Sequence, residues 1–191
     1  MAKAVISAGL LPPLITLGII RLTEAIFLIA ATVLWGQGLI SIGLAGDQLL
    51  SGIKRGLLWS FAFGAAVSCV FGILYAGGIN PLSFFRMRVP ERPLEIIYLY
   101  VAGGLLSPIA EEIFFRGILY GFLRRWGVMT AIFLSTLLFV LPHLADTSLP
   151  VAQFVGGMVF AVSYEVEGKL TVPITIHVLG NLSIMTLSVL F

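Results

Sequence analysis

The sequence Glu111-Glu112-Ile113-Phe114-Phe115-Arg116 places three ionisable side chains within six positions of an otherwise apolar stretch. Residues 96–110 before it and residues 117–123 after it contain no charged residue. An Asp, Lys or Arg at the centre of a membrane helix costs roughly 2.5 to 3.5 kcal/mol to insert. Such groups are tolerated there when they face protein or water, so this stretch marks a candidate functional site within a membrane helix.

The composition of the whole chain is that of an integral membrane protein. Of its 191 residues, 59% are hydrophobic and 10% are charged, and the mean hydropathy is +1.10. An ordinary soluble domain has about 25% charged residues. The net charge of +2 is too small to indicate a nucleic-acid partner. The length fits a single membrane-embedded domain, residues 1–191, with a motif-bearing core over about 95–191.

Apolar runs of about 20 residues predict an all-α, polytopic bundle of about six to eight transmembrane or membrane-embedded helices, without strands. The expected apolar helices are 4–20, 25–35, 57–76, 94–123, 128–141, 151–164 and 170–191. Arg21 and Glu24 are expected to mark the far end of the first helix. Residues 39–56, with spaced charges among leucines and isoleucines, predict an amphipathic helix at the membrane surface.

The helix that carries the acidic stretch is expected to restart at Ser107-Pro108. Serine is a favoured N-cap and proline a favoured first helical residue, so Glu111 would lie near the positive end of the new helix. Residues 83–93 predict a polar connection, and residues 146–148 predict a turn.

The membrane orientation follows from the basic residues between the predicted helices. With the N-terminus in the cytoplasm and seven crossings, six basic residues fall inside and four outside. The inside residues are Lys3, Lys54, Arg55, Arg124, Arg125 and Lys169, and the outside residues are Arg21, Arg86, Arg88 and Arg92. This difference favours a cytoplasmic N-terminus by a small margin.

The acidic stretch divides by helical phase. Glu112 and Arg116 are four residues apart, the spacing of an ion pair on one helix face, whereas Glu111 is rotated by about 100° from Glu112. This phase favours a structural pair of Glu112 and Arg116 and leaves Glu111 free for chemistry. The alternative is that all three side chains form a buried polar cluster that locks the fold.

The chain has two histidines, and each lies in or beside an apolar run with a helix-spaced companion. Phe139 precedes His143 by four residues, and Asn181 follows His177 by four, so each pair would share a helix face. Pro142 leaves two interpretations open: the helix ends there, or a kink directs His143 inward. A carboxylate can act as a general base, an imidazole can align water, and a second imidazole with an amide can donate to an oxyanion.

Three elements occur in this order: Glu111-Glu112-x-x-x-Arg116, Phe139-x-x-x-His143 and His177-x-x-x-Asn181. Together they resemble the signature of the CPBP family, the CAAX-type intramembrane endopeptidases also called the Abi family. The resemblance covers roughly the second half of the chain. It implies that Glu111 is the general base, assisted by His143, and that His177 and Asn181 stabilise the oxyanion. It also implies that Glu112, Arg116 and Phe139 organise the site.

The resemblance leaves two mechanisms open. A metal-free glutamate mechanism without a cofactor is preferred, because the sequence has no H-E-x-x-H helix. The alternative is a zinc ion held by Glu111, His143 and His177, since one carboxylate and two imidazoles can ligate this metal.

The resemblance further implies a multi-pass protein of a prokaryotic cell inner (plasma) membrane. Its partners would be the lipid bilayer and a membrane-anchored or lipidated protein, cut near the C-terminus. Prenylated proteins, C-terminal sorting signals and bacteriocin-type peptides are alternative substrates. Two other functions would use the same residues, a transporter or proton relay and a non-catalytic immunity or scaffold protein. The lack of an internal repeat disfavours a transporter, and the complete motif set disfavours a silent scaffold.

Overall fold

The computed structural model describes residues 12–82, 87, 89–145 and 150–190, and these ranges form helices and connections without a strand. Four helical stretches are long and apolar enough to cross a membrane: Pro13–Leu34, Leu39–Ala76, Pro93–Trp126 and Thr171–Leu190. A shorter apolar helix spans Val128–Leu144. The all-α membrane bundle is thereby confirmed, although the described ranges hold four full-length candidate spans rather than seven.

The first described helix, α2 (Pro13–Leu34), is continuous. The prediction of separate helices at 4–20 and 25–35 is therefore wrong within the described ranges, and residues 4–11 lie outside them. Arg21 and Glu24 lie inside α2 instead of at a helix end, so Arg21 is not in an outside loop. Their side chains form an ion pair of 2.8 Å at the i,i+3 spacing, so both charges have a partner within an uninterrupted helix.

The next segment consists of two 3₁₀ turns, η1 (Leu39–Ile42) and η2 (Gly46–Gln48), followed by the helix α3 (Leu49–Ala76). The predicted amphipathic surface helix at 39–56 is wrong, because its second half is the beginning of α3. Close packing explains this: Gly56 is buried, and a Cβ added there would lie 2.5 Å from Cβ of Thr175 in α9 (Thr171–Leu190). Gly52 and Gly56 thus pack against α9, whereas Leu50, Ile53, Lys54 and Arg55, which suggested a surface helix, stay exposed on α3.

The acidic stretch lies in one long helical run that changes its winding. Its segments are α4 (Pro93–Leu99), π-helical η4 (Tyr100–Leu106), α5 (Ser107–Glu112), π-helical η5 (Ile113–Tyr120), α6 (Gly121–Leu123) and the 3₁₀ turn η6 (Arg124–Trp126). The predicted restart is wrong, because Ser107 has helical φ and ψ of −62° and −52° and α5 has no side-chain cap. Glu111 thus lies within a continuous helix. The predicted end is confirmed at Gly127, where φ is 110°.

The remaining helices are α7 (Val128–Val140), the 3₁₀ turn η7 (Leu141–Ala145), α8 (Val151–Glu167) and α9. They agree with the predicted runs at 128–141, 151–164 and 170–191. The α-helical part of α7 ends two residues before Pro142 and continues as the 3₁₀ turn η7, so this change of winding agrees in part with each of the two interpretations. The predicted turn at 146–148 lies outside the described residues, as does part of the connection at 83–93.

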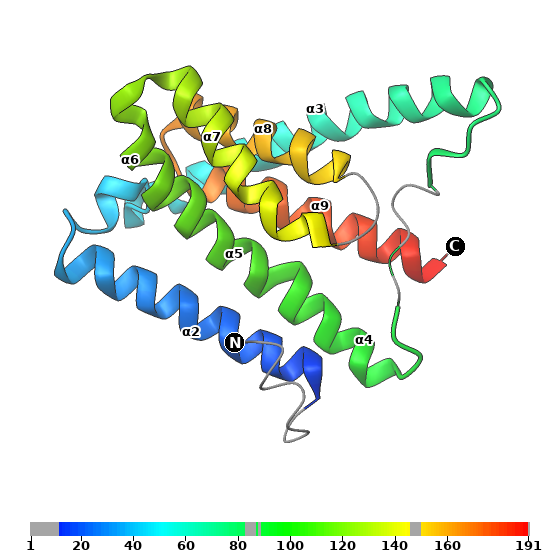
Figure 1. The fold of residues 1–191 in the computed structure, drawn as a ribbon, viewed down its shortest axis with the longest axis horizontal. Helices are drawn as coiled ribbons and strands as arrows, with labels where there is room; N and C mark the ends of the chain where they lie inside the picture. Colours follow the sequence, from blue (N-terminus) through cyan, green and yellow to red (C-terminus); the bar gives the residue numbers. More distant parts are fainter. Residues whose placement is uncertain (1–11, 83–86, 88, 146–149, 191) are drawn as a thin grey trace.

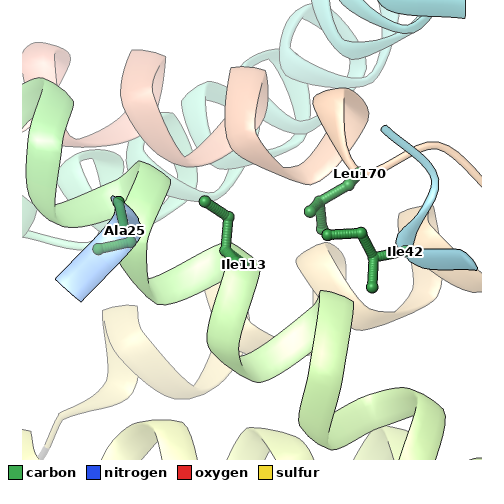
Figure 2. Packing of buried hydrophobic residues seen from close by; sticks show 5 residues of the cluster. Ala25, Ile42, Ile113 and Leu170 are labelled. Atoms are coloured by element: carbon green, nitrogen blue, oxygen red, sulfur yellow. The ribbon is translucent and has the colours of Figure 1, made fainter. Parts of the chain in front are cut away.

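The helices pack so that α2 lies beside the long run α4–α6, while α7 pairs with α8 and α3 with α9 (Figure 1). A buried apolar cluster joins distant segments around the acidic stretch. Figure 2 shows Ala25 of α2, Ile42 of η1, Ile113 of η5 and Leu170 next to α9, all in this cluster. The Leu170 N–H also donates to the Gly43 carbonyl at 2.9 Å. These contacts place α2 and α9 against the helix that carries Glu111 and Glu112.

The close approach of α3 and α9 yields a test of the fold. Gly56→Ala should lower the thermal unfolding temperature in detergent, because overpacking of this kind costs typically about 1–3 kcal/mol. Gly64→Ala on the same helix is the matched control, since nothing lies within 4 Å of an added Cβ there. Equal unfolding temperatures for the two variants would contradict the packing of α3 on α9.

Candidate active site

A cavity of about 340 Å³ lies between α2, the helix that carries Glu111, and the end of α7. Its lining combines charged and aromatic side chains: Arg21, Glu24, Glu111, Phe114, Phe115, Phe139, Pro142 and His143. Two of the four predicted catalytic residues, Glu111 and His143, thus face the same space. A carboxylate and an imidazole beside a cavity of this size can act together on a water molecule and a bound peptide.

The Glu111 carboxylate has different neighbours at its two oxygens. Oε1 accepts a hydrogen bond from Nη2 of Arg21 at 3.0 Å, and Oε2 lies 3.8 Å from Nε2 of His177. The side chain is 12% exposed. The sequence pattern supplied no partner for Glu111, and the structure provides one from α2, 90 residues earlier in the chain.

Glu112 lies on a different, fully buried face of the helix. Nη1 of Arg116 donates to Oε1 of Glu112 at 2.9 Å, and both side chains are 0% exposed, which confirms the predicted ion pair. Nη2 of Arg116 donates to the Gly157 carbonyl of α8 at 3.0 Å. A Cβ at residue 157 would lie 3.0 Å from Cγ2 of Thr136 in α7, so the glycine permits α8 to approach α7 closely. The guanidinium carbon also lies 4.8 Å from the ring centroid of Phe139.

His177 lies between the two glutamates. Its Nδ1 is 2.8 Å from Oε1 of Glu112, and its ring stacks on Phe160 with centroids 4.5 Å apart. A carboxylate accepts hydrogen bonds, so Nδ1 is assigned as the donor. The neutral ring then carries its lone pair on Nε2, on the Glu111 side. Because Nδ1 already carries a proton, Nε2 can donate to an oxyanion only when it is protonated as well.

His143 lies in the 3₁₀ turn after α7, and its Nδ1 is 3.0 Å from the Phe139 carbonyl oxygen. Since a carbonyl accepts, Nδ1 is again assigned as the donor, which leaves Nε2 as an acceptor in the neutral ring. The rings of Phe139 and His143 have centroids 5.2 Å apart. Their predicted shared face is therefore confirmed, although the α-helix ends between them.

Asn181 contacts the backbone of the long helix rather than the cavity lining. Its Nδ2 donates to the Gly103 carbonyl at 3.0 Å. In the π-helical segment η4 the N–H of Ser107 bonds to the Ala102 carbonyl, so the next donor in register would be residue 108. That residue is Pro108, which has no N–H. The Asn181 amide thus supplies a hydrogen bond that the proline cannot make, and its oxyanion role stays a prediction.

The alternative zinc site is not assembled in the described part of the chain. No three His, Cys, Asp or Glu side chains among those residues lie close enough to hold a metal ion. The proposed ligands Glu111, His143 and His177 are therefore not gathered in this structure.

Sequence reasoning missed Arg21 and Glu24 as members of the site. The available signal was an oppositely charged pair, three residues apart, within an apolar run.

Comparison with known proteins finds a family match over the part of the chain that carries the three motifs. Residues 93–183 match the family described as type II CAAX prenyl endopeptidase Rce1-like. The chain is also 30% identical over 122 residues to the membrane-embedded CAAX protease MroQ of Staphylococcus aureus strain USA300. That alignment covers 60% of this chain and 48% of the relative, so the chain spans about half the length of that protein. No solved structure matches the chain. The resemblance indicated by the three motifs is thereby confirmed.

The buried pair of Glu112 and Arg116 yields a second test. Arg116→Ala should destabilise the protein by about 3–5 kcal/mol, because it leaves a buried charge without its partner. The matched control is Arg124→Ala, which removes an Arg–Glu pair whose side chains are 45% and 27% exposed. Solvent screens a largely accessible pair of this kind, so its loss should destabilise the protein much less. Thermal unfolding in detergent measures both, and similar losses in the two variants would contradict the structural role of Arg116.

Proposed function

We propose that this chain, whose residues 93–183 form a CAAX-type endopeptidase domain, is an intramembrane endopeptidase in which Glu111 activates water. The observation that carries the proposal is the position of the Glu111 carboxylate. It lines the cavity together with His143, and its second oxygen lies 3.8 Å from His177. All three motifs also fall within the matched residues.

The proposed reaction is direct hydrolysis of a peptide bond. Glu111 takes one proton from a water molecule in the cavity as the water oxygen bonds to the scissile carbonyl carbon. The carbonyl π electrons move to oxygen and form a tetrahedral oxyanion. When this intermediate collapses, the C–N bond breaks and the proton on Glu111 passes to the leaving nitrogen. Nε2 of His143, an acceptor in the neutral ring, would accept a hydrogen bond from the second hydrogen of the water, which stays on the oxygen of the new carboxyl group.

The oxyanion would be stabilised by His177 and Asn181, as the family resemblance implies. For His177 this role requires a proton on Nε2, because Nδ1 already donates to Glu112. For Asn181 it requires the second amide hydrogen, because one hydrogen bonds to the Gly103 carbonyl. Each oxyanion donor typically contributes about 100- to 1,000-fold to kcat.

Glu112, Arg116 and Phe139 would organise the site without contacting substrate. Glu112 orients His177 through the 2.8 Å contact, and Arg116 ties Glu112 to the Gly157 carbonyl of α8. Phe139 packs against the rings of both His143 and His177, at centroid distances of 5.2 and 5.6 Å. This support would keep the two imidazoles in their present orientations.

The proposed substrate is a membrane-anchored or lipidated protein that is cut near its C-terminus. The matched family is described as prenyl endopeptidases, which makes a prenylated peptide the first substrate to test. C-terminal sorting signals and bacteriocin-type peptides follow. The aromatic part of the cavity lining, including Phe114 and Phe115, suits an apolar segment of such a substrate. A multi-pass location in a prokaryotic inner (plasma) membrane is part of the same proposal.

The central test is the substitution Glu111→Gln. It keeps the size of the side chain but removes the base, so cleavage of membrane peptides by the purified protein should fall below detection. The matched control is Glu95→Gln on the same long helix, where the carboxylate is exposed and pairs with Arg92. The assay follows product formation in detergent by mass spectrometry.

Two outcomes would contradict this proposal. Wild-type activity in a folded Glu111→Gln variant would exclude Glu111 as the base. Loss of wild-type activity with a chelator, restored by zinc, would replace the metal-free mechanism with the zinc alternative.

His143 provides an independent test. His143→Ala should lower kcat by about 100- to 10,000-fold, the usual contribution of a general acid–base group, while KM changes much less. Steady-state kinetics measure both constants, and thermal unfolding checks the fold. A folded variant with kcat within twofold of the wild-type value would remove His143 from the mechanism.

A further inference from the structure

We infer that Arg21 of α2 is a positioning residue for Glu111, so that the active site includes a helix outside residues 93–183. This inference rests on the proposed function of Glu111. Arg21 lies well before the matched region, which begins at residue 93. It nevertheless lines the same cavity as Glu111 and His143.

The guanidinium of Arg21 holds two carboxylates at once. Nη1 donates to Oε2 of Glu24 at 2.8 Å, and Nη2 donates to Oε1 of Glu111 at 3.0 Å. The planar fork of arginine fixes the direction of both bonds. Glu24 therefore anchors the guanidinium on its own helix, and the guanidinium in turn orients the carboxylate of Glu111 on another helix.

This contact distinguishes the two oxygens of Glu111. Arg21 occupies Oε1, so the lone pairs of Oε2 are the ones directed toward the His177 side, where Nε2 lies 3.8 Å away. A general base needs one oxygen at a fixed angle to water, and loss of that angle slows the reaction.

A purely structural role for Arg21 makes a different prediction. An arginine within a membrane helix is costly, so it is retained where it serves a partner or a site. The apolar cluster of Ala25, Ile42, Ile113 and Leu170 already packs α2 against the acidic helix. Removal of the guanidinium should therefore leave α2 in place while Glu111 loses its orientation. Kinetics can separate this outcome from simple destabilisation.

The test compares Arg21→Ala and Arg21→Lys with the wild-type protein. Arg21→Ala should lower kcat by about 10- to 100-fold with KM changed less than about threefold, because the base is misoriented and the substrate contacts remain. Arg21→Lys should recover part of kcat, since it keeps the charge but lacks the fork. The matched control is Arg92→Ala, which removes another i,i+3 Arg–Glu pair whose arginine is 83% exposed and does not line the cavity. It should stay within about twofold of wild type.

Chemical rescue provides the readout that a structural role would not produce. Guanidinium chloride at a non-denaturing concentration should restore a large part of the kcat that Arg21→Ala loses, because the free cation can occupy the place of the side chain. Sodium chloride at the same ionic strength should not. Unchanged kcat in Arg21→Ala, an effect confined to KM, or the absence of rescue would each overturn the inference.

A stability cycle keeps this inference distinct from the proposed function. Thermal unfolding of Arg21→Ala, Glu111→Gln and the double variant should give non-additive shifts, because the two side chains are paired. If the wild-type protein cleaves no peptide, the proposed function fails, and a non-additive cycle still supports the pairing. If the wild-type protein cleaves peptides and the cycle is additive, the inference about Arg21 fails alone.

Discussion

The buried ion pair of Glu112 and Arg116 connects three helices of the second half of the protein. Arg116 reaches α8 through the Gly157 carbonyl, and Glu112 reaches α9 through His177. A pair of this kind adds little net stability, since desolvation offsets the attraction, but the loss of either partner is expensive. Its effect is therefore one of geometry: Arg116 reaches the Gly157 carbonyl and Glu112 reaches His177 only when α8 and α9 stand where they do. The position of His177 beside Glu111 follows from this constraint.

Helical phase then assigns different surroundings to two adjacent glutamates. Glu112 is held by protein groups on the buried side, whereas Glu111 lines the cavity and meets side chains from α2 and α9. The membrane location makes this division possible, because each ionisable group must have a partner or a water-accessible space. Glu112 meets that requirement through its ion pair with Arg116. Glu111 meets it through Arg21 and through the cavity that it lines, which can hold water. The proposed chemistry uses the second.

Much of this arrangement could be predicted from local spacing, and the errors have physical causes. The pair of Glu112 and Arg116 and the shared face of Phe139 and His143 depend on contacts within one helical turn, so the sequence contains them. The restart at Ser107-Pro108 was wrong because π-helical winding accommodates the proline, and the free Gly103 carbonyl finds Asn181 from another helix. The pairing of Arg21 with Glu111 could not be read from spacing, since it depends on tertiary packing of α2. The packing of α3 on α9 is likewise tertiary, so local spacing did not show that α3 begins where a surface helix was expected.

The central claim is that water in the cavity hydrolyses a peptide bond within the membrane. Its most direct measurement is cleavage of a membrane-anchored peptide by the reconstituted protein in water enriched with oxygen-18, with the products weighed by mass spectrometry. The account predicts an N-terminal product whose new carboxylate carries one solvent oxygen, formed by the wild-type protein and not by Glu111→Gln. The absence of cleavage by the wild-type protein across the candidate peptide classes, or a product without solvent oxygen, would contradict it.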